Sequence, residues 1–244
     1  MKKQVLPKLI HNQITDLKFS DYLFVDFNNE NNQADAIRRF RASKEDYKAL
    51  AIEQKFPQIQ IQFPETWNKF REEILMADYK PGLFVIEKFI NEDYETDSSI
   101  QKVLDLESFR SLLKIQQLLH HNFDNNFFAS LKEFKLEDYI KELKELLIGK
   151  NAFYWGFYKG KELKGFIGIE KQCAELYINE LIIDEEFRGQ GKGKMLMFEA
   201  FHFAFQSSVK KMTTTLSVFN HTGLIFYKSL GFKINAAKYY MNLI

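Results

Sequence analysis

This sequence of 244 residues has one cysteine and only eleven glycines, and both scarcities constrain its function. The single cysteine, Cys173, cannot form a disulfide within the chain, which indicates a reducing compartment. No histidine pattern accompanies Cys173, so we expect a small buried or half-buried residue rather than a catalytic thiol. The scarcity of glycine makes a cluster of glycines informative, because glycine permits backbone angles and close approaches that other residues do not.

The sequence also lacks an excess of charge and a long apolar segment. The formal net charge is +1, so bulk charge argues for neither a nucleic-acid partner nor an acidic membrane surface. No run reaches the roughly 18 apolar residues that a membrane span needs. The basic segment 1–16 has no sustained apolar stretch, so we expect no signal peptide. We therefore expect a soluble, cytoplasmic protein that binds neither nucleic acid nor membrane.

The composition, 45% hydrophobic and 27% charged, is typical of a globular protein with one large domain or two smaller ones. The polar, acidic stretch 91–99 is the best candidate for a linker. We predict an N-terminal α/β region at 1–97 and a second domain at 98–244. The predicted N-terminal elements are strands at 22–27, 59–63 and 83–90 and helices at 34–56 and 65–79, with a break at Pro81-Gly82.

In the second domain the patterns predict a mixed α/β fold with a crossover helix directly after a glycine loop. The other predicted elements are helices at 109–119, 136–147 and 221–230 and strands at 152–158, 163–170, 175–184, 211–218 and 238–244. The helix after the loop is apolar almost all round, so we expect it to be buried against a sheet. A weak similarity between 69–89 and 225–244 is interpreted as chance.

The glycine loop is the hexapeptide RGQGKG, which places three glycines within five positions after an apolar strand. A Walker A loop would need Ser or Thr after Lys194 and a glycine at Arg188, so that interpretation fails. A dinucleotide fingerprint would need the spacing GxGxxG and an acidic residue at the end of the next strand, and both are missing. A plain structural turn remains the simplest alternative.

The spacing Arg-x-x-Gly-x-Gly, after a strand and before a helix, resembles the pyrophosphate loop of the GNAT superfamily of N-acetyltransferases. A second stretch, NHTGLIFYKSLGF, is similar to the second signature of that family and carries Asn220 and Tyr227. In isolation these two residues would suit a helix N-cap and a core position. The resemblance covers about residues 100 to 244. It implies a mixed, mostly antiparallel sheet flanked by helices, with an additional smaller N-terminal α/β domain.

The resemblance also implies how acetyl-CoA is bound, without any metal. Strand 175–183 is expected to splay from strand 211–218, so that the pantetheine arm lies between them. Backbone N–H groups at the start of the next helix would bind the pyrophosphate, which also suits the positive end of a helix dipole. The implied cofactor-binding residues are Leu181, Ile182, Ile183, Arg188, Gly189, Gln190, Gly191, Lys192, Gly193, Lys194 and Asn220.

For the reaction, the resemblance assigns Tyr227 as the general acid for the leaving thiolate. The general base is less determined, because Tyr177 and Asn179 occupy two common positions for it and neither is a natural base. We prefer Glu180 over Glu175, and a base acting only through water remains an alternative. Strict alternation would place these two carboxylates on opposite faces unless a bulge intervenes.

The predicted function is acetyl-CoA-dependent transfer of an acetyl group to a primary amine of a small molecule, protein or peptide, by direct attack on the thioester. The alternative is a non-catalytic module that binds or senses acyl-CoA. The adjacent His120 and His121 lack the spacing of metal ligands, and no metal site is expected. Residues 1–97 are interpreted as a degenerate partner domain, an acceptor-binding lid or a dimerisation element, so a homodimer is an open alternative.

Overall fold

The computed structural model describes residues 23–28, 30–53, 58–103, 141, 145 and 151–243. The helix predicted at 109–119, most of the helix predicted at 136–147, and His120 and His121 lie outside these residues. The described strands are β1 (Leu23–Asp26), β2 (Gln58–Pro64), β3 (Lys80–Phe89), β4 (Ile100–Lys102), β5 (Ala152–Lys159), β6 (Glu162–Gln172), β7 (Glu175–Ile183), β8 (Lys211–Ser217) and β9 (Lys233–Asn242). The helices are α1 (Gln33–Glu53), α2 (Asn68–Met76), α5 (Lys192–Gln206), α6 (His221–Ser229) and the short 3-10 helix η2 (Glu185–Phe187).

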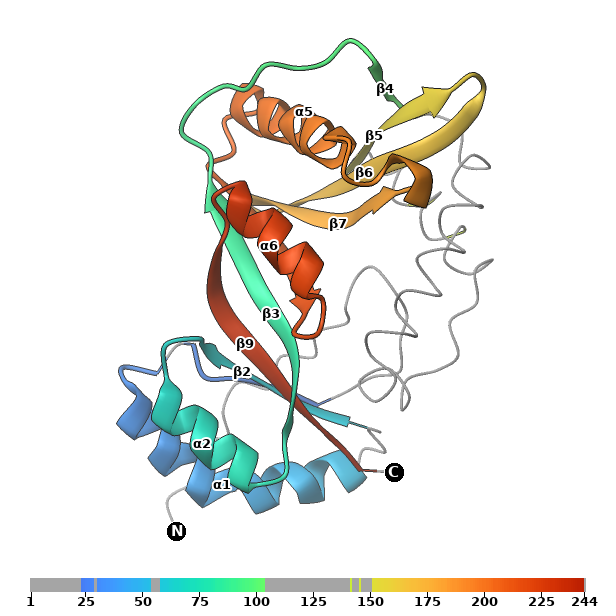
Figure 1. The fold of residues 1–244 in the computed structure, drawn as a ribbon. Coiled ribbons are helices and arrows are strands. Elements are labelled where there is room, and N and C mark those ends of the chain that lie inside the picture. The colour runs from blue at the N-terminus through green and yellow to red at the C-terminus, as the bar shows by residue number, and fades with distance from the viewer. Residues whose placement is uncertain are drawn as a thin grey trace.

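The described strands form one sheet in the order β1-β2-β9-β3-β8-β7-β6-β5-β4. Only β1 with β2 and β7 with β8 pair in parallel, so the predicted fold class, a mixed and mostly antiparallel sheet flanked by helices, is confirmed. Strand β9 lies between β2 and β3, and β3 also pairs with β8. Figure 1 shows β3 and β9 as a long pair that joins the two ends of the molecule. The boundary between residues 97 and 98 stays a prediction, and the sheet is continuous across it.

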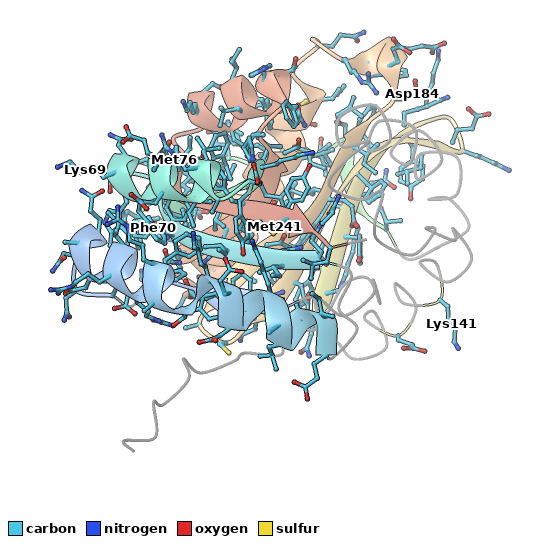
Figure 2. The ribbon with its side chains drawn as sticks, turned by 90° about the horizontal axis from the view of Figure 1, so that it is seen from below. Lys69, Phe70, Met76, Lys141, Asp184 and Met241 are labelled. Atoms are coloured by element: carbon cyan, nitrogen blue, oxygen red, sulfur yellow. The ribbon has the colours of Figure 1, made fainter. Side chains whose placement is uncertain are left out.

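One hydrophobic cluster lies under α1 and α2 and includes residues from β2 and β9. Helix α1 buries Ala36, Phe40, Tyr47 and Ala51, which follow helical spacing and therefore share one face. Phe70 of α2 packs among the rings of Phe27, Phe40 and Phe63. Figure 2 shows Phe70 on the side of α2 that faces α1, while Lys69 and Met76 point outward.

A second cluster lies between the other part of the sheet and the helices α5 and α6. Helix α5 buries Leu196, Met197, Ala200, Phe201 and Ala204, which confirms that the helix after the glycine loop is buried against the sheet. Phe84 of β3 packs against both clusters and so lies where the two halves of the core meet. Among the described helices, none is long and apolar enough to cross a membrane.

Two local expectations are wrong. The predicted break at Pro81-Gly82 is part of β3, because Gly82 is the extra residue at a register shift opposite β9 and a bulge accommodates it. Cys173 is exposed rather than buried, because it lies in the turn between β6 and β7 with φ 54°. Neither error affects the loop after β7.

Candidate functional site

The hexapeptide 188–193, which runs from the loop after β7 into the start of α5, uses its three glycines in two different ways. Gly189 and Gly191 have φ of 74° and 78°, a left-handed conformation that favours glycine. A Cβ atom built on either residue would meet nothing within 4 Å, so the space in front of both is open. At Gly193, a Cβ would lie 3.4 Å from the ring of Phe226, so this glycine allows α5 to pack closely against α6.

The first turn of α5 has no side-chain cap. Its N-cap residue is Gly191, and no side chain accepts a hydrogen bond there. By contrast, the N-cap Asn220 of α6 accepts a hydrogen bond from the Gly223 N–H at 2.8 Å. The first N–H groups of a helix have no partner within the helix and carry partial positive charge, so those of α5 are suited to an anion.

Three basic side chains lie at the start of this helix. The Arg188 Nε donates to the Ile183 carbonyl at 3.1 Å, which ties the side chain to the end of β7. The Lys192 and Lys194 ammonium groups lie over the rings of Phe157 and Phe198, at 5.6 and 5.2 Å from the ring centroids. The Gln190 side chain donates to the Glu186 carbonyl and holds the loop from within. Among the described residues, these three cations form no ion pair, so their charge is available to a ligand.

Strands β7 and β8 separate beside this loop. They pair only at Leu176 with Met212 and at Tyr177 with Thr213, although both strands continue beyond these residues. The expected splay between them is therefore confirmed. Side chains hold the narrow end together, since the Tyr177 hydroxyl lies 2.7 Å from Thr215 Oγ1.

The residues predicted to bind the pantetheine arm lie along this separated part of β7. Leu181, Ile182 and Ile183 pair with β6 on one side. On the other side, no described strand pairs with them. Apart from the Ile183 carbonyl, which accepts from Arg188 Nε, backbone groups on that side of β7 are therefore available for hydrogen bonds to a ligand.

A β-bulge at Asn179 decides which face of β7 carries Glu180. Gly168 of β6 is opposite Glu180 and Ile169 is opposite Ile178, so Asn179 is the extra residue. The bulge shifts the alternation, and Leu176, Ile178, Leu181 and Ile183 all pack on the α5 side. Glu175 and Glu180 consequently share the opposite face, which strict alternation would not have given.

The surroundings of the two carboxylates differ. Glu175 is half-buried and pairs with the Lys211 ammonium at 2.5 Å, and this hydrogen bond raises the pKa of Lys211. Glu180 is only 7% exposed. Glu175 therefore has a cationic partner, and Glu180 is the more deeply buried of the two carboxylates.

Glu180 lies in a row of residues across three strands. Tyr154 of β5 pairs with Gly168 of β6, and Gly168 pairs with Glu180. A Cβ on Gly168 would lie 2.4 Å from Tyr154 Cε1 and 3.1 Å from Glu180 Oε2, so both side chains lie over this glycine. Neither Tyr154 nor Gly168 was predicted from the sequence to be a site residue. The isolated glycine within the apolar strand pattern was the available signal, because such a glycine often marks a close approach.

Tyr227 projects from α6 into the core beside the separated strands. It is 7% exposed, and its ring centroid lies 5.1 Å from that of Phe232 and 5.5 Å from that of Phe226. Burial, and to a lesser extent the nearby Tyr177, raise the pKa of Tyr227. Its phenol therefore keeps its proton at neutral pH and can act as a donor.

Asn179, which the sequence places at a common position for the general base, has a buried side chain. Among the described residues, neither of its two polar side-chain atoms has a hydrogen-bond partner. Buried amides are rarely left without partners in the absence of a reason, and a ligand is one such reason. The bulge that carries Asn179 depends on pairing with β6 and could not be predicted from the sequence.

The histidines and acidic residues give no sign of a metal centre. Across the described ranges, no group of three His, Cys, Asp or Glu side chains is placed to hold a metal ion. His202 Nδ1 lies 2.7 Å from an Asp93 carboxylate oxygen on the surface of α5, and His221 is exposed.

The fold and the site together define a class of protein: a mixed sheet whose parted strands and uncapped glycine loop suit an extended, anionic ligand. Residues 114–232 match the family described as Acetyltransferase (GNAT) family. This match confirms the resemblance found in the sequence and shows an acetyltransferase domain of the GNAT type in this part of the chain. No curated protein matches the sequence significantly.

Solved structures share the fold over most of the chain, including its N-terminal part. A GCN5-related N-acetyltransferase from Sphaerobacter thermophilus has a TM-score of 0.59 at 11% identity, covering 96% of this chain and 75% of that one. A tandem GNAT protein from the clavulanic acid biosynthesis pathway has a TM-score of 0.56 at 12% identity, covering 84% and 70%. A functionally unknown conserved protein from Staphylococcus epidermidis has a TM-score of 0.52 at 13% identity, covering 95% and 93%.

Proposed function

We propose that this protein binds acetyl-CoA between β7 and β8 and transfers the acetyl group to a primary amine of a small molecule, protein or peptide. The observation that carries the proposal is the parting of β7 from β8 directly beside the uncapped start of α5. When bound, acetyl-CoA supplies an activated thioester, and the residues around it bind, orient and exchange protons.

The loop residues fit a pyrophosphate. The open space in front of Gly189 and Gly191 lets phosphate oxygens approach the backbone, and the first N–H groups of α5 donate to them. Arg188, Lys192 and Lys194 add positive charge at the same end of the helix. Asn220 already caps α6 through its Oδ1, which leaves its Nδ2 as the atom that would donate to the cofactor arm.

The separated part of β7 fits the rest of the cofactor. In place of pairing with β8, backbone groups of Leu181, Ile182 and Ile183 would form hydrogen bonds with the pantetheine amides. Backbone N–H groups in the same stretch would stabilise the negative charge that develops on the carbonyl oxygen during attack.

Two side chains move protons in this proposal. Glu180 accepts a proton from the attacking amine, directly or through water, so that the nitrogen lone pair forms the new bond to the acetyl carbon. Tyr227 donates its proton to the sulfur as the carbon–sulfur bond breaks, and its raised pKa means that the phenol is protonated at neutral pH. Free CoA and an N-acetylated amine are the products.

The test is release of free CoA thiol from acetyl-CoA with a panel of amines that includes polyamines, amino acids, aminoglycosides and lysine peptides. We expect Glu180→Gln and Tyr227→Phe to lower kcat by about 10²- to 10⁴-fold while acetyl-CoA affinity changes little. Matched controls are Glu170→Gln and Tyr239→Phe, since both residues are also buried and lie on β6 and β9, outside the two strands that part.

The outcomes separate the two candidate functions. Binding of acetyl-CoA without transfer to any amine would favour the acyl-CoA-binding or sensing module. Absence of acetyl-CoA binding would overturn both. Equal losses in the Tyr227 and Tyr239 variants would show that Tyr227 acts through stability and not as the acid.

A further inference from the structure

Two segments of the chain have the same order of elements, and the last three elements of each have the same lengths. The first unit, residues 23–89, contains β1, α1, β2, α2 and β3, and the second unit, residues 176–242, contains β7, α5, β8, α6 and β9. Strands β2 and β8 each have 7 residues. Helices α2 and α6 each have 9 residues, and strands β3 and β9 each have 10. From the end of the first helix onward the spacing between these elements is also equal, so corresponding residues differ by one constant number, whereas β1 and α1 differ in length from β7 and α5.

Strand pairing follows the same correspondence. Leu23 pairs with Ile59 in the first unit, and their counterparts Leu176 and Met212 pair in the second. The start of β2 pairs with the end of β9, Gln58 with Asn242, and the start of β8 pairs with the end of β3, Lys211 with Phe89. Register depends on every residue in a strand, so this agreement is not expected of unrelated αβ units.

The centre of the sheet is symmetric as well. Phe84 pairs with Ala237, and these two residues are each other's counterparts. The register shifts on either side involve Gly82 and Asn235, which also correspond. A two-fold axis between β3 and β9 therefore relates the units.

The two units exchange their last strands. Strand β3 of the first unit pairs with β8, and strand β9 of the second unit pairs with β2. Figure 1 shows these strands crossing between the end that carries α1 and α2 and the end that carries α5 and α6. In the second unit, β8 forms the far wall of the gap. The strand that pairs with β8 on its other side is β3, which comes from the N-terminal region.

The first unit lacks a counterpart of the gap and of the glycine loop. Strands β1 and β2 pair along the whole of β1, and the Phe27 N–H continues the ladder to the Gln62 carbonyl at 2.9 Å. The Asn32 side chain accepts hydrogen bonds from the N–H groups of Ala34 and Asp35 at the start of α1, both at 3.0 Å. The carboxylate of Asp35 adds negative charge there, which opposes a phosphate.

We infer that the chain is an internal duplication with exchanged last strands, and that it binds one acyl-CoA per chain, in the second unit only. The first unit has no second cofactor site and completes the sheet beside the gap, so it folds together with the second unit. The one-site assignment rests on the proposed function, whereas the strand exchange does not.

The first experiment counts sites by isothermal titration of the full chain with acetyl-CoA. We expect one site per chain and no residual binding in Gly191→Val. Two sites in the wild type, or residual binding in the variant, would overturn the one-site assignment and leave the proposed function standing. No binding by the wild type would overturn both.

The second experiment uses the two tryptophans. Trp67 lies in the first unit, and Trp155 lies in β5, which precedes the second unit in the chain. Trp155→Phe leaves Trp67 as the only reporter, and Trp67→Phe is the reciprocal variant. Because the strands are exchanged, we expect both reporters and far-UV circular dichroism to show one urea midpoint, raised equally by acetyl-CoA.

A Trp67 transition at a different midpoint from that of Trp155 would contradict the exchange of strands. The same holds if acetyl-CoA raised only the Trp155 midpoint. If one of the two variants folds poorly, the other still decides the question, because its tryptophan midpoint can be compared with its own circular dichroism midpoint. Coincidence of the midpoints without ligand supports the exchange independently of the proposed function.

Discussion

The two glycines Gly191 and Gly160 give a matched test of the proposed cofactor loop. Gly191 has φ 78° in the loop after β7, and Gly160 has φ 63° in the turn between β5 and β6. A Cβ atom added to either would meet nothing within 4 Å. Replacement by alanine therefore imposes the same strain at both positions and no steric clash within the protein.

The expected loss of stability is the cost of a left-handed alanine, about 1–2 kcal/mol in each variant. For a protein of this size, each kcal/mol lowers Tm by roughly 2–4 °C. We expect Gly160→Ala and Gly191→Ala to lower Tm by similar amounts, measured by circular dichroism without ligand.

Only Gly191→Ala should weaken acetyl-CoA binding. Its methyl group projects into the open space that we assign to the pyrophosphate, and it prevents the phosphate oxygens from reaching the backbone. We expect Kd to rise by about tenfold or more, which corresponds to a loss of about 1.4 kcal/mol or more in binding free energy. Isothermal titration measures this directly. Equal Kd values for the two variants would refute the assignment of this loop to the pyrophosphate.

Three further changes test other contacts. Asn220→Ala removes the cap on the Gly223 N–H, so we expect a loss of about 1 kcal/mol, measured by urea unfolding. Gly168→Ala places a methyl group 2.4 Å from Tyr154 Cε1, and overpacking of this kind costs about 1–3 kcal/mol; it should also lower kcat without changing acetyl-CoA affinity. Burial lowers the pKa of Lys238 from 10.5 to about 8, so the unfolded chain binds more protons between these values and stability rises with pH across that window. We expect Lys238→Met to abolish this rise, measured by urea unfolding at pH 7 to 10; an unchanged pH dependence would contradict the assignment.

The sequence by itself determined the local parts of the site. The positive φ angles of Gly189 and Gly191, the cap by Asn220 and the burial of one face of each helix depend on residues close together in the chain. Such features follow from conformational preference and periodicity, so the glycine loop, the following helix and Tyr227 could be placed on their elements in advance.

Only the tertiary structure decided how the strands are joined and on which face of β7 Glu180 lies. The bulge at Asn179 arises from pairing with Gly168 of β6, and it brings Glu180 to the same face as Glu175. The insertion of β9 between β2 and β3 depends on pairing between residues far apart in the chain. A strand's own sequence specifies its alternation but not its partner. The exchange of β3 and β9 therefore depends on pairing between the two units, which the sequence of either strand does not specify.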